Sequence, residues 1–256
     1  MRFIDTHTHF YDERLLPDAD AAVQRALDAG VEKMIQADVD GGERDLMWEI
    51  GRKYPGILFQ MAGLYPGSVN EDWRNDLDLV RDAALHRPVV AIGEVGLDYH
   101  EGLEFAKEQK EVLRLQLELA SELDLPVNIH LRDAVEDFLG VLKDCRGLQL
   151  RGNLHCFSAS YELYEQANRY ADLSVGIGGV VTFKNSRLPE TLKRIPMEKI
   201  LLETDAPYLA PTPLRGTRNE SANIPLIAAK IAEVKGLGLE EVAAQTTANA
   251  EKLFRI

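Results

Sequence analysis

The segment Phe3-Ile4-Asp5-Thr6-His7-Thr8-His9, near the start of this 256-residue chain, sets a pattern that recurs along the sequence. A short apolar run suited to a β-strand ends in side chains that can bind metal. Strand side chains alternate between two faces, so His7 and His9 are predicted to point the same way and to hold one ion. A His-x-His pair alone is more often explained by ordinary packed or exposed histidines. The interpretation therefore depends on the rest of the chain.

Four further candidate ligands occupy similar positions: Glu94, His130, His155 and Asp205. Glu94 lies in an apolar run, residues 88 to 95, that is too short for a helix and rich in β-branched residues. His130, His155 and Asp205 end, or nearly end, the runs 125 to 130, 149 to 156 and 199 to 205. The alternative is a coincidence of unrelated polar residues at strand ends. Against it, four of the six histidines and two carboxylates nearly match the ligand set of a two-metal hydrolase.

Predicted strands and helices alternate along the whole chain. The strands lie at about residues 3 to 9, 31 to 38, 57 to 64, 88 to 95, 126 to 131, 149 to 156, 172 to 177 and 199 to 205. The helices lie at about 18 to 29, 42 to 54, 71 to 86, 104 to 124, 133 to 145, 159 to 171, 187 to 195, and 223 to 253 as one broken or two short helices. This alternation predicts an α/β fold, a (β/α)8 TIM barrel in a single domain over residues 1 to 256. Active sites of such barrels gather at the C-terminal strand ends.

Composition limits the range of partners. A formal charge of -13 argues against a broad basic face that grips long duplex, but it leaves the end of a nucleic acid possible. The first strand begins at residue 3 and no apolar run reaches membrane-spanning length, so we expect a cytoplasmic protein without membrane contact or an obligate protein partner. With only Cys145 and Cys156 present, we expect no disulfide, and Cys156 should face the helix layer.

Several basic side chains follow predicted strands and could bind phosphate. We expect Arg132, Lys184 and Arg218 to contact a nucleic acid substrate. Arg187 and Arg215 fall in similar segments, but we interpret them as solvated surface side chains.

Several local strings are specific in combination. They are residues 5 to 9 (DTHTH), 92 to 99 (IGEVGLDY), 130 to 134 (HLRDA), 154 to 158 (LHCFS), 181 to 185 (VTFKN), 203 to 211 (ETDAPYLAP) and 215 to 220 (RGTRNE). In this order they resemble the TatD family of metal-dependent deoxyribonucleases, within the amidohydrolase-like barrels. The resemblance covers essentially the whole chain.

The resemblance implies two divalent metal ions. His7, His9, Glu94 and Asp205 would hold one ion, and Glu94, His130 and His155 the other, with Glu94 bridging. Imidazoles and carboxylates suit Zn²⁺, Mn²⁺ or Co²⁺, whereas Mg²⁺ would bind so His-rich a site more loosely. A metal-bound hydroxide would attack phosphorus, with Asp205 as general base and Glu94 as the second catalytic residue.

The sequence departs from the family's pattern at two positions. Tyr65, in Leu64-Tyr65-Pro66-Gly67, stands where family members commonly carry a histidine. It is predicted to bind a phosphate oxygen but transfers protons poorly near neutral pH. Ser221 follows Glu220 where proline is usual, which we take as minor. Glu203, two residues before Asp205, is predicted to pair with a ligand histidine or with Lys184 and so to support the site.

These observations favour a metal-dependent deoxyribonuclease that cleaves phosphodiester bonds at DNA ends or in single-stranded DNA, as an exonuclease. One alternative keeps the two metals but hydrolyses a small amide, ester or lactone, because a fold does not determine its function. A second alternative is a non-catalytic metal-binding protein, for which Tyr65 is the only support. Basic side chains that converge on the metals would favour the nuclease, and a narrow apolar pocket would favour the small substrate.

Overall fold

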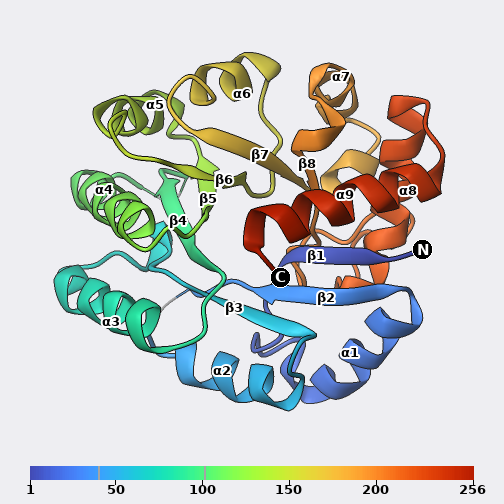
Figure 1. Cartoon of the computed structure of the whole chain (residues 1–256), viewed down its shortest axis with the longest axis horizontal. Helices are drawn as coiled ribbons and strands as arrows, with labels where there is room; N and C mark the ends of the chain where they lie inside the picture. Colours follow the sequence, from blue (N-terminus) through green and yellow to red (C-terminus); the bar gives the residue numbers. More distant parts are fainter. Residues whose placement is uncertain (40, 101) are drawn as a thin grey trace.

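The computed structural model describes residues 1 to 39, 41 to 100 and 102 to 256. Within these residues, eight parallel strands form one sheet in the order β1 to β8, ringed by helices (Figure 1). The predicted (β/α)8 barrel is therefore confirmed. The strands are β1 Phe3–Thr8, β2 Val31–Gln36, β3 Leu58–Ala62, β4 Ala91–Asp98, β5 Val127–Arg132, β6 Arg151–Leu154, β7 Asp172–Ile177 and β8 Ile200–Leu202.

The helices follow the strands in turn and cover the outside of the barrel. The α-helices are α1 Ala19–Asp28, α2 Arg44–Lys53, α3 Trp73–His86, α4 Ala106–Glu122, α5 Val135–Asp144, α6 Tyr161–Ala167, α7 Leu188–Arg194, α8 Ile224–Lys235 and α9 Leu239–Phe254. Short 3-10 helices are η1 Leu16–Asp18, η2 Pro66–Ser68, η3 Gly179–Thr182, η4 Met197–Lys199 and η5 Ser221–Asn223. The described residues include no helix with the length and hydropathy of a transmembrane segment.

The barrel closes where β1 meets the segment that follows β8. Asp205 N donates to His7 O at 2.9 Å, and His9 N donates to Ala206 O at 2.8 Å. Thr8 and Ala206 form a parallel bridge between the same two segments. Closure thus places the two N-terminal histidines beside Asp205, which lies near the other end of the chain.

Helix α9 covers the N-terminal end of the barrel. Its Phe254 side chain, 3% exposed, packs in one apolar cluster with Ile4, Met61, Ala91 and Leu201. Ile4, Ala91 and Leu201 lie at the first or second position of their strands. Figure 1 shows α9 crossing the barrel on this side.

One predicted helix is shorter in the structure, and another segment adopts one of the two arrangements expected for it. The helix expected at 159 to 171 ends as α6 at Ala167, because the Asn168 side chain donates to Tyr164 O and accepts from Leu173 N, linking the helix directly to β7. Residues 223 to 253 form two helices, since Gly236 adopts φ 67° and ends α8.

Candidate metal centre

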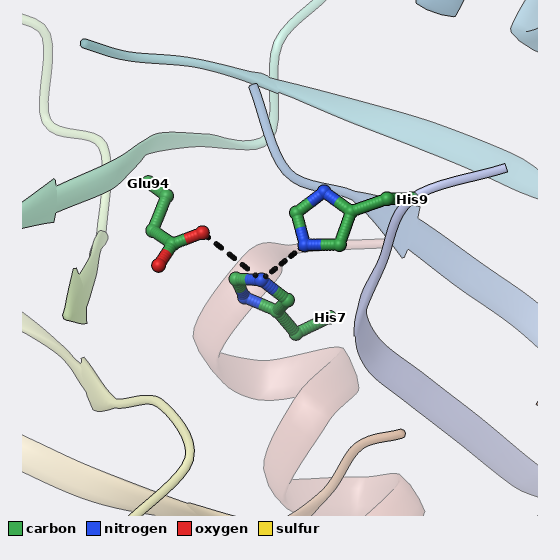
Figure 2. A group of neighbouring side chains, drawn as sticks. All are labelled: His7, His9 and Glu94. Carbon is green, nitrogen blue, oxygen red and sulfur yellow. Dashed lines mark hydrogen bonds and ion pairs between the residues drawn. The ribbon is translucent and has the colours of Figure 1, made fainter. Parts of the chain in front are cut away.

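Four of the predicted ligands approach one another where the barrel closes. His7 Nε2 lies 3.1 Å from His9 Nε2 and 3.3 Å from Glu94 Oε2, so that His9 and Glu94 approach the same nitrogen (Figure 2). Asp205 Oδ1 lies 3.4 Å from His9 Nε2 and 3.7 Å from His7 Nε2. Donor atoms from β1, β4 and the segment after β8 therefore meet at one point.

The other two predicted ligands meet the second oxygen of the same glutamate. Glu94 Oε1 lies 2.9 Å from His130 Nδ1 and 3.2 Å from His155 Nε2. The His155 ring stacks on His7 with ring centroids 3.7 Å apart, which brings the two groups of ligands side by side. Glu94 thus lies between two sets of imidazoles, and its two oxygens face different sets.

The candidate ligands do not all lie at strand ends, as the sequence had suggested. Glu94 is in the middle of β4, which starts at Ala91 and runs to Asp98 instead of ending at residue 95. The strand extends because Gly96, at φ 154°, approaches β5 so closely that a Cβ atom there would lie 1.8 Å from His130 O. Glycine is the residue that tolerates this conformation and this approach.

Register shifts lie beside His7 and Glu94 in their strand pairings. The pairing of β4 with β5 shifts between Ile92 and Val95, and that of β1 with β2 shifts between Asp5 and Thr8. Strict alternation between faces is interrupted at such irregularities, which can re-aim a side chain. His7 and His9 converge as predicted, but regular strand geometry alone does not account for it.

Hydrogen bonds hold the outward nitrogens of His7 and His9. His7 Nδ1 lies 2.9 Å from Asn128 Oδ1, and the Asn128 amide donates in turn to Asn153 Oδ1 at 3.1 Å. His9 Nδ1 lies 3.0 Å from the Tyr11 hydroxyl, which donates its proton to Ala37 O at 2.7 Å. Both Nδ1 atoms are therefore donors, and both Nε2 atoms present lone pairs to the cluster.

A carboxylate holds His130 by a hydrogen bond, and another carboxylate lies beside His155. His130 Nε2 donates to Asp98 Oδ2 at 2.9 Å, and the Tyr65 hydroxyl donates to the same oxygen at 3.2 Å. His155 Nδ1 lies 3.3 Å from Glu203 Oε1, so Glu203 stands beside a ligand histidine. Carboxylates in this position make an imidazole a stronger metal ligand.

The donor set fits a divalent cation. Two Nε2 lone pairs 3.1 Å apart, with a carboxylate oxygen at 3.3 Å, repel one another unless positive charge lies between them. Three groups of buried and half-buried candidate ligands have atoms within 4.8 Å of one another, namely His7, His9 and Glu94; His7, His155 and Asp205; and Glu94, His130 and His155. Such imidazole-rich sets suit Zn²⁺, Mn²⁺ or Co²⁺.

The pKa shifts in the cluster agree with this charge arrangement. Burial favours neutral Glu94, but the imidazoles of His155 and His7 outweigh it and hold the pKa of Glu94 well below its ordinary value. Burial also opposes protonation of His155, yet the carboxylates of Glu94 and Glu203 raise its pKa well above the usual range. The cluster therefore stabilises positive charge beside an ionised Glu94.

A cavity of about 620 Å³ contains five of these ligands and is lined by other predicted substrate contacts. Arg132 and Tyr65 lie in its wall, together with Asp12, Tyr208 and Leu209. A volume of this size is typical of pockets for small-molecule ligands.

Two of the predicted phosphate contacts lie outside this lining. Lys184 is exposed in the segment after η3. The guanidinium of Arg218 instead pairs with Asp18 and donates to Arg14 O at 3.0 Å. The expectation that Arg218 faces the pocket is therefore not met, because a carboxylate near the start of α1 lies closer to it.

Cys156 does not face the helix layer, contrary to the expectation. Strand β6 ends at Leu154, and Cys156 adopts φ 46°, so strand alternation no longer sets its direction. Its side chain lines the pocket, and burial raises the pKa of its thiol to about 12. The two cysteines, Cys145 and Cys156, are both free thiols, as expected.

The sequence analysis named Glu203 as a supporting residue but missed Asn128 and Asn153, although the same signal marks all three. Asn128, Asn153 and Glu203 each lie two residues before a candidate ligand, and all three are fully buried. Buried polar residues at this spacing indicate a polar layer beneath the ligands. Gly176 makes room for it, since a Cβ atom there would lie 1.9 Å from Glu203 Oε2.

Ser221, which follows Glu220, has a structural role. Ser221 Oγ donates to Asp5 Oδ2 at 2.6 Å, and Thr204 Oγ1 donates to the same oxygen at 2.6 Å. Asp5 Oδ1 accepts from Thr204 N at 2.9 Å. The hydroxyl of Ser221 thus helps to satisfy a fully buried carboxylate that links β1 to the segment after β8.

Known proteins match this chain over nearly its whole length. A family profile described as TatD related DNase matches residues 4–255. An uncharacterised metal-dependent hydrolase, YabD, of Bacillus subtilis (strain 168) is 38% identical over 253 residues, which cover 98% of each protein. A 3'-5' ssDNA/RNA exonuclease TatD of Erwinia billingiae (strain Eb661) is 36% identical, over 93% of this chain and 94% of that protein.

Solved structures agree in fold. The TatD homologue YJJV of Escherichia coli K12 is 29% identical and superposes with a TM-score of 0.92, over 100% of this chain and 98% of that one. The family profile and these relatives agree with the histidine and carboxylate cluster described above. The chain therefore belongs to the family of TatD-related DNases, which are metal-dependent hydrolases.

Proposed function

We propose that this protein is a metal-dependent exonuclease that hydrolyses phosphodiester bonds at the ends of single-stranded DNA. The observation that carries the proposal is the cluster of four imidazoles and two carboxylates, five of which line a pocket together with Arg132. The Erwinia relatives named 3'-5' ssDNA/RNA exonucleases support the same class of substrate. The formal charge of -13 is compatible with binding an end and unfavourable for gripping long duplex.

In this proposal, six side chains bind the metal ions and Arg132 binds the substrate phosphate. His7, His9, Glu94 and Asp205 would hold one ion, and Glu94, His130 and His155 a second. When bound, such ions neutralise charge that develops on the phosphate and lower the pKa of water. Arg132 would hold a phosphate oxygen through its forked donors.

Asp205 is the proposed general base. Burial alone would raise its pKa, but the hydrogen bond with His9 and the nearby imidazoles lower it, so the carboxylate is ionised at neutral pH. The attacking water would give its proton to Asp205 while its oxygen forms the new bond to phosphorus. The bond from phosphorus to the leaving sugar oxygen then breaks, and solvent protonates that oxygen.

The test is hydrolysis of end-labelled single strands by the metal-stripped and reconstituted protein. Asp205→Asn should lower the rate by about two to four orders of magnitude. Asparagine tolerates the left-handed backbone at this position, where φ is 57°, so the variant should keep its fold. A variant that keeps most of the wild-type rate at saturating metal would exclude Asp205 as the base.

Two arginine variants make a matched pair for the phosphate contact. Arg132→Ala should weaken cleavage by about 10-fold or more and flatten its salt dependence. Arg81→Ala should leave cleavage close to wild type, because the Arg81 guanidinium on α3 pairs with Glu122 outside the pocket lining. Equal effects of the two variants would contradict the assignment of Arg132.

A second candidate function is hydrolysis of a small ester, amide or lactone. It is favoured by the apolar part of the pocket lining, which includes Val39, Leu131 and Val180, and by the position of Lys184 outside that lining. A panel of small esters assayed beside the oligonucleotides separates the two functions. Fast ester hydrolysis with no oligonucleotide cleavage would replace the nuclease by this candidate.

A further inference from the structure

Two large apolar side chains stand exposed at the edge of the pocket. Tyr208 and Leu209 line the cavity, yet they are 40% and 41% exposed. They follow the candidate ligand Asp205 by three and four residues. Exposed apolar side chains that adjoin one another beside a site are a common mark of a binding surface.

The backbone holds these side chains in the exposed position. Tyr208 N donates to Asp205 O at 2.8 Å, and the Asn219 side chain donates to Tyr208 O at 2.7 Å. The Tyr208 hydroxyl donates to Asp12 Oδ2 at 2.8 Å, which fixes the ring. Leu209 adopts φ 54°, a left-handed conformation that costs energy for a bulky residue. The exposure is therefore built into the fold.

Guanidinium groups lie against the aromatic rings of this edge. Arg14 lies over the Tyr208 ring at 4.4 Å from its centroid. On the adjoining segment, Arg215 lies over Phe183 at 4.0 Å. The two segments are joined, since Thr212 N donates to Thr182 Oγ1 at 2.8 Å. Aromatic rings interleaved with arginines are typical of surfaces that bind unpaired nucleic acid by base stacking.

We propose that Tyr208 and Leu209 form a stacking subsite for the unpaired base next to the scissile phosphate. The proposal rests on the nuclease function proposed above and specifies its substrate. Arg14 supplies positive charge beside the subsite. Stacking is available to every base, so the subsite selects unpaired nucleotides without reading their sequence. A base that stays paired in a blunt duplex end cannot reach this platform.

The test compares Tyr208→Ala with the wild type on single strands that carry either a normal or an abasic terminal nucleotide. Abasic 5' and 3' ends are both used, so that the cleaved end is covered. The wild type should cleave the base-bearing end about 5- to 100-fold more efficiently in kcat/KM, and Tyr208→Ala should remove most of this difference. Tyr208→Phe should keep it, because the ring remains. A wild-type level of discrimination by Tyr208→Ala would overturn the subsite.

A matched control variant and a binding measurement test the stacking subsite independently of hydrolysis. Tyr161 on α6 lies under Arg194 at 3.8 Å in a similar pair outside the pocket lining, so Tyr161→Ala should discriminate as the wild type does. Binding of the same oligonucleotides to Asp205→Asn, with and without Tyr208→Ala, is followed by fluorescence anisotropy. A Tyr208-dependent preference for the base-bearing strand, found together with a reconstituted wild type that cleaves no oligonucleotide, would retain the subsite and remove the nuclease. Oligonucleotide cleavage by the wild type without a Tyr208-dependent preference for the base-bearing strand would retain the nuclease and remove the subsite.

Discussion

At the scale of single residues, the outward nitrogens of the candidate ligand histidines decide how the cluster can bind metal. His130 differs from the others, because it presents Nδ1 to Glu94 and directs Nε2 at Asp98. Asp98 lies beyond the strand predicted at about 88 to 95, but in the structure it belongs to β4 and is 8% exposed. Burial would raise its pKa, yet the hydrogen bond from His130 and the amide of His100 lower the pKa of Asp98 to about 2.

We predict that Asp98→Asn lowers the affinity for Zn²⁺ or Mn²⁺ by about 10- to 100-fold, because the carboxylate no longer orients His130 or increases its basicity. Isothermal titration calorimetry of the metal-stripped protein measures the change. Tyr65→Phe is the control, since it removes one hydroxyl from the same carboxylate and leaves the bond to His130 in place. Its effect should be smaller. Equal affinities of Asp98→Asn and the wild type would show that Asp98 does not support the ligand.

At the scale of elements, the loop after β8 is tied to the start of α1 by ion pairs. Arg218 and Arg25 both pair with Asp18, and Arg25 also pairs with Glu220 at 2.6 Å. Hydrogen bonds from Arg218 and Arg25 lower the pKa of Asp18 to about 2. The network holds the loop that precedes η5 and thereby the segment that carries Tyr208 and Asn219.

We predict a small, pH-dependent stabilisation from Asp18. Its pKa in the folded protein lies below its ordinary value, so the contribution is complete above pH about 4 and is lost as the pH falls toward about 2. The side chain is 36% exposed, so solvent screening limits the effect to below about 1 kcal/mol. Urea unfolding of the wild type and Asp18→Asn at pH 6 and pH 3 tests this. A difference in unfolding free energy that does not shrink at pH 3 would contradict it.

Helix α9 is the element that covers the barrel's N-terminal end, and its contribution is apolar packing. Phe254→Ala should lower the free energy of unfolding by about 3 to 5 kcal/mol, because it leaves a cavity among buried side chains. Leu226→Ala on α8 is the control, since Leu226 is 38% exposed and its loss should cost less than about 0.5 kcal/mol. Chemical denaturation measures both variants. Similar losses for the two would show that α9 contributes little to the core.

At the scale of the whole molecule, metal binding and barrel closure should reinforce each other. The candidate ligands come from β1 and the residue after it, from β4 and β5, and from the segments that follow β6 and β8, so bound metal would link the first strand to the segment after the last. Because the unfolded chain has no such preformed site, binding free energy stabilises the fold.

We predict that metal at about 100 times its dissociation constant adds roughly 2.7 kcal/mol of stability and raises the melting temperature by about 5 to 10 °C. Differential scanning calorimetry of metal-stripped and reconstituted protein tests this. Glu94→Gln should show a much smaller shift, since Glu94 faces both sets of imidazoles. Identical melting of stripped and reconstituted wild type would exclude a structural metal contribution.

The sequence by itself determined the fold class and the candidates for the cluster. Alternating apolar runs specify strands and helices locally, and their order specifies a barrel whose strand ends meet. Side-chain chemistry marked the six candidate ligands, and the structure brings all six together. The spacing of two residues between Asn128 and His130 also indicates the buried polar layer beneath the ligands.

Only the tertiary structure decided the features that depend on contacts between distant segments. The position of Glu94 within β4 follows from the close approach of Gly96 to β5, and the inward nitrogen of each histidine follows from partners such as Asn128, Tyr11 and Asp98. The pairing of Arg218 with Asp18 depends on how the last loop returns to the first helix. The physical reason is common to all of them. Barrel closure and strand register determine which side chains meet in space, and the local sequence pattern does not encode these contacts between distant segments.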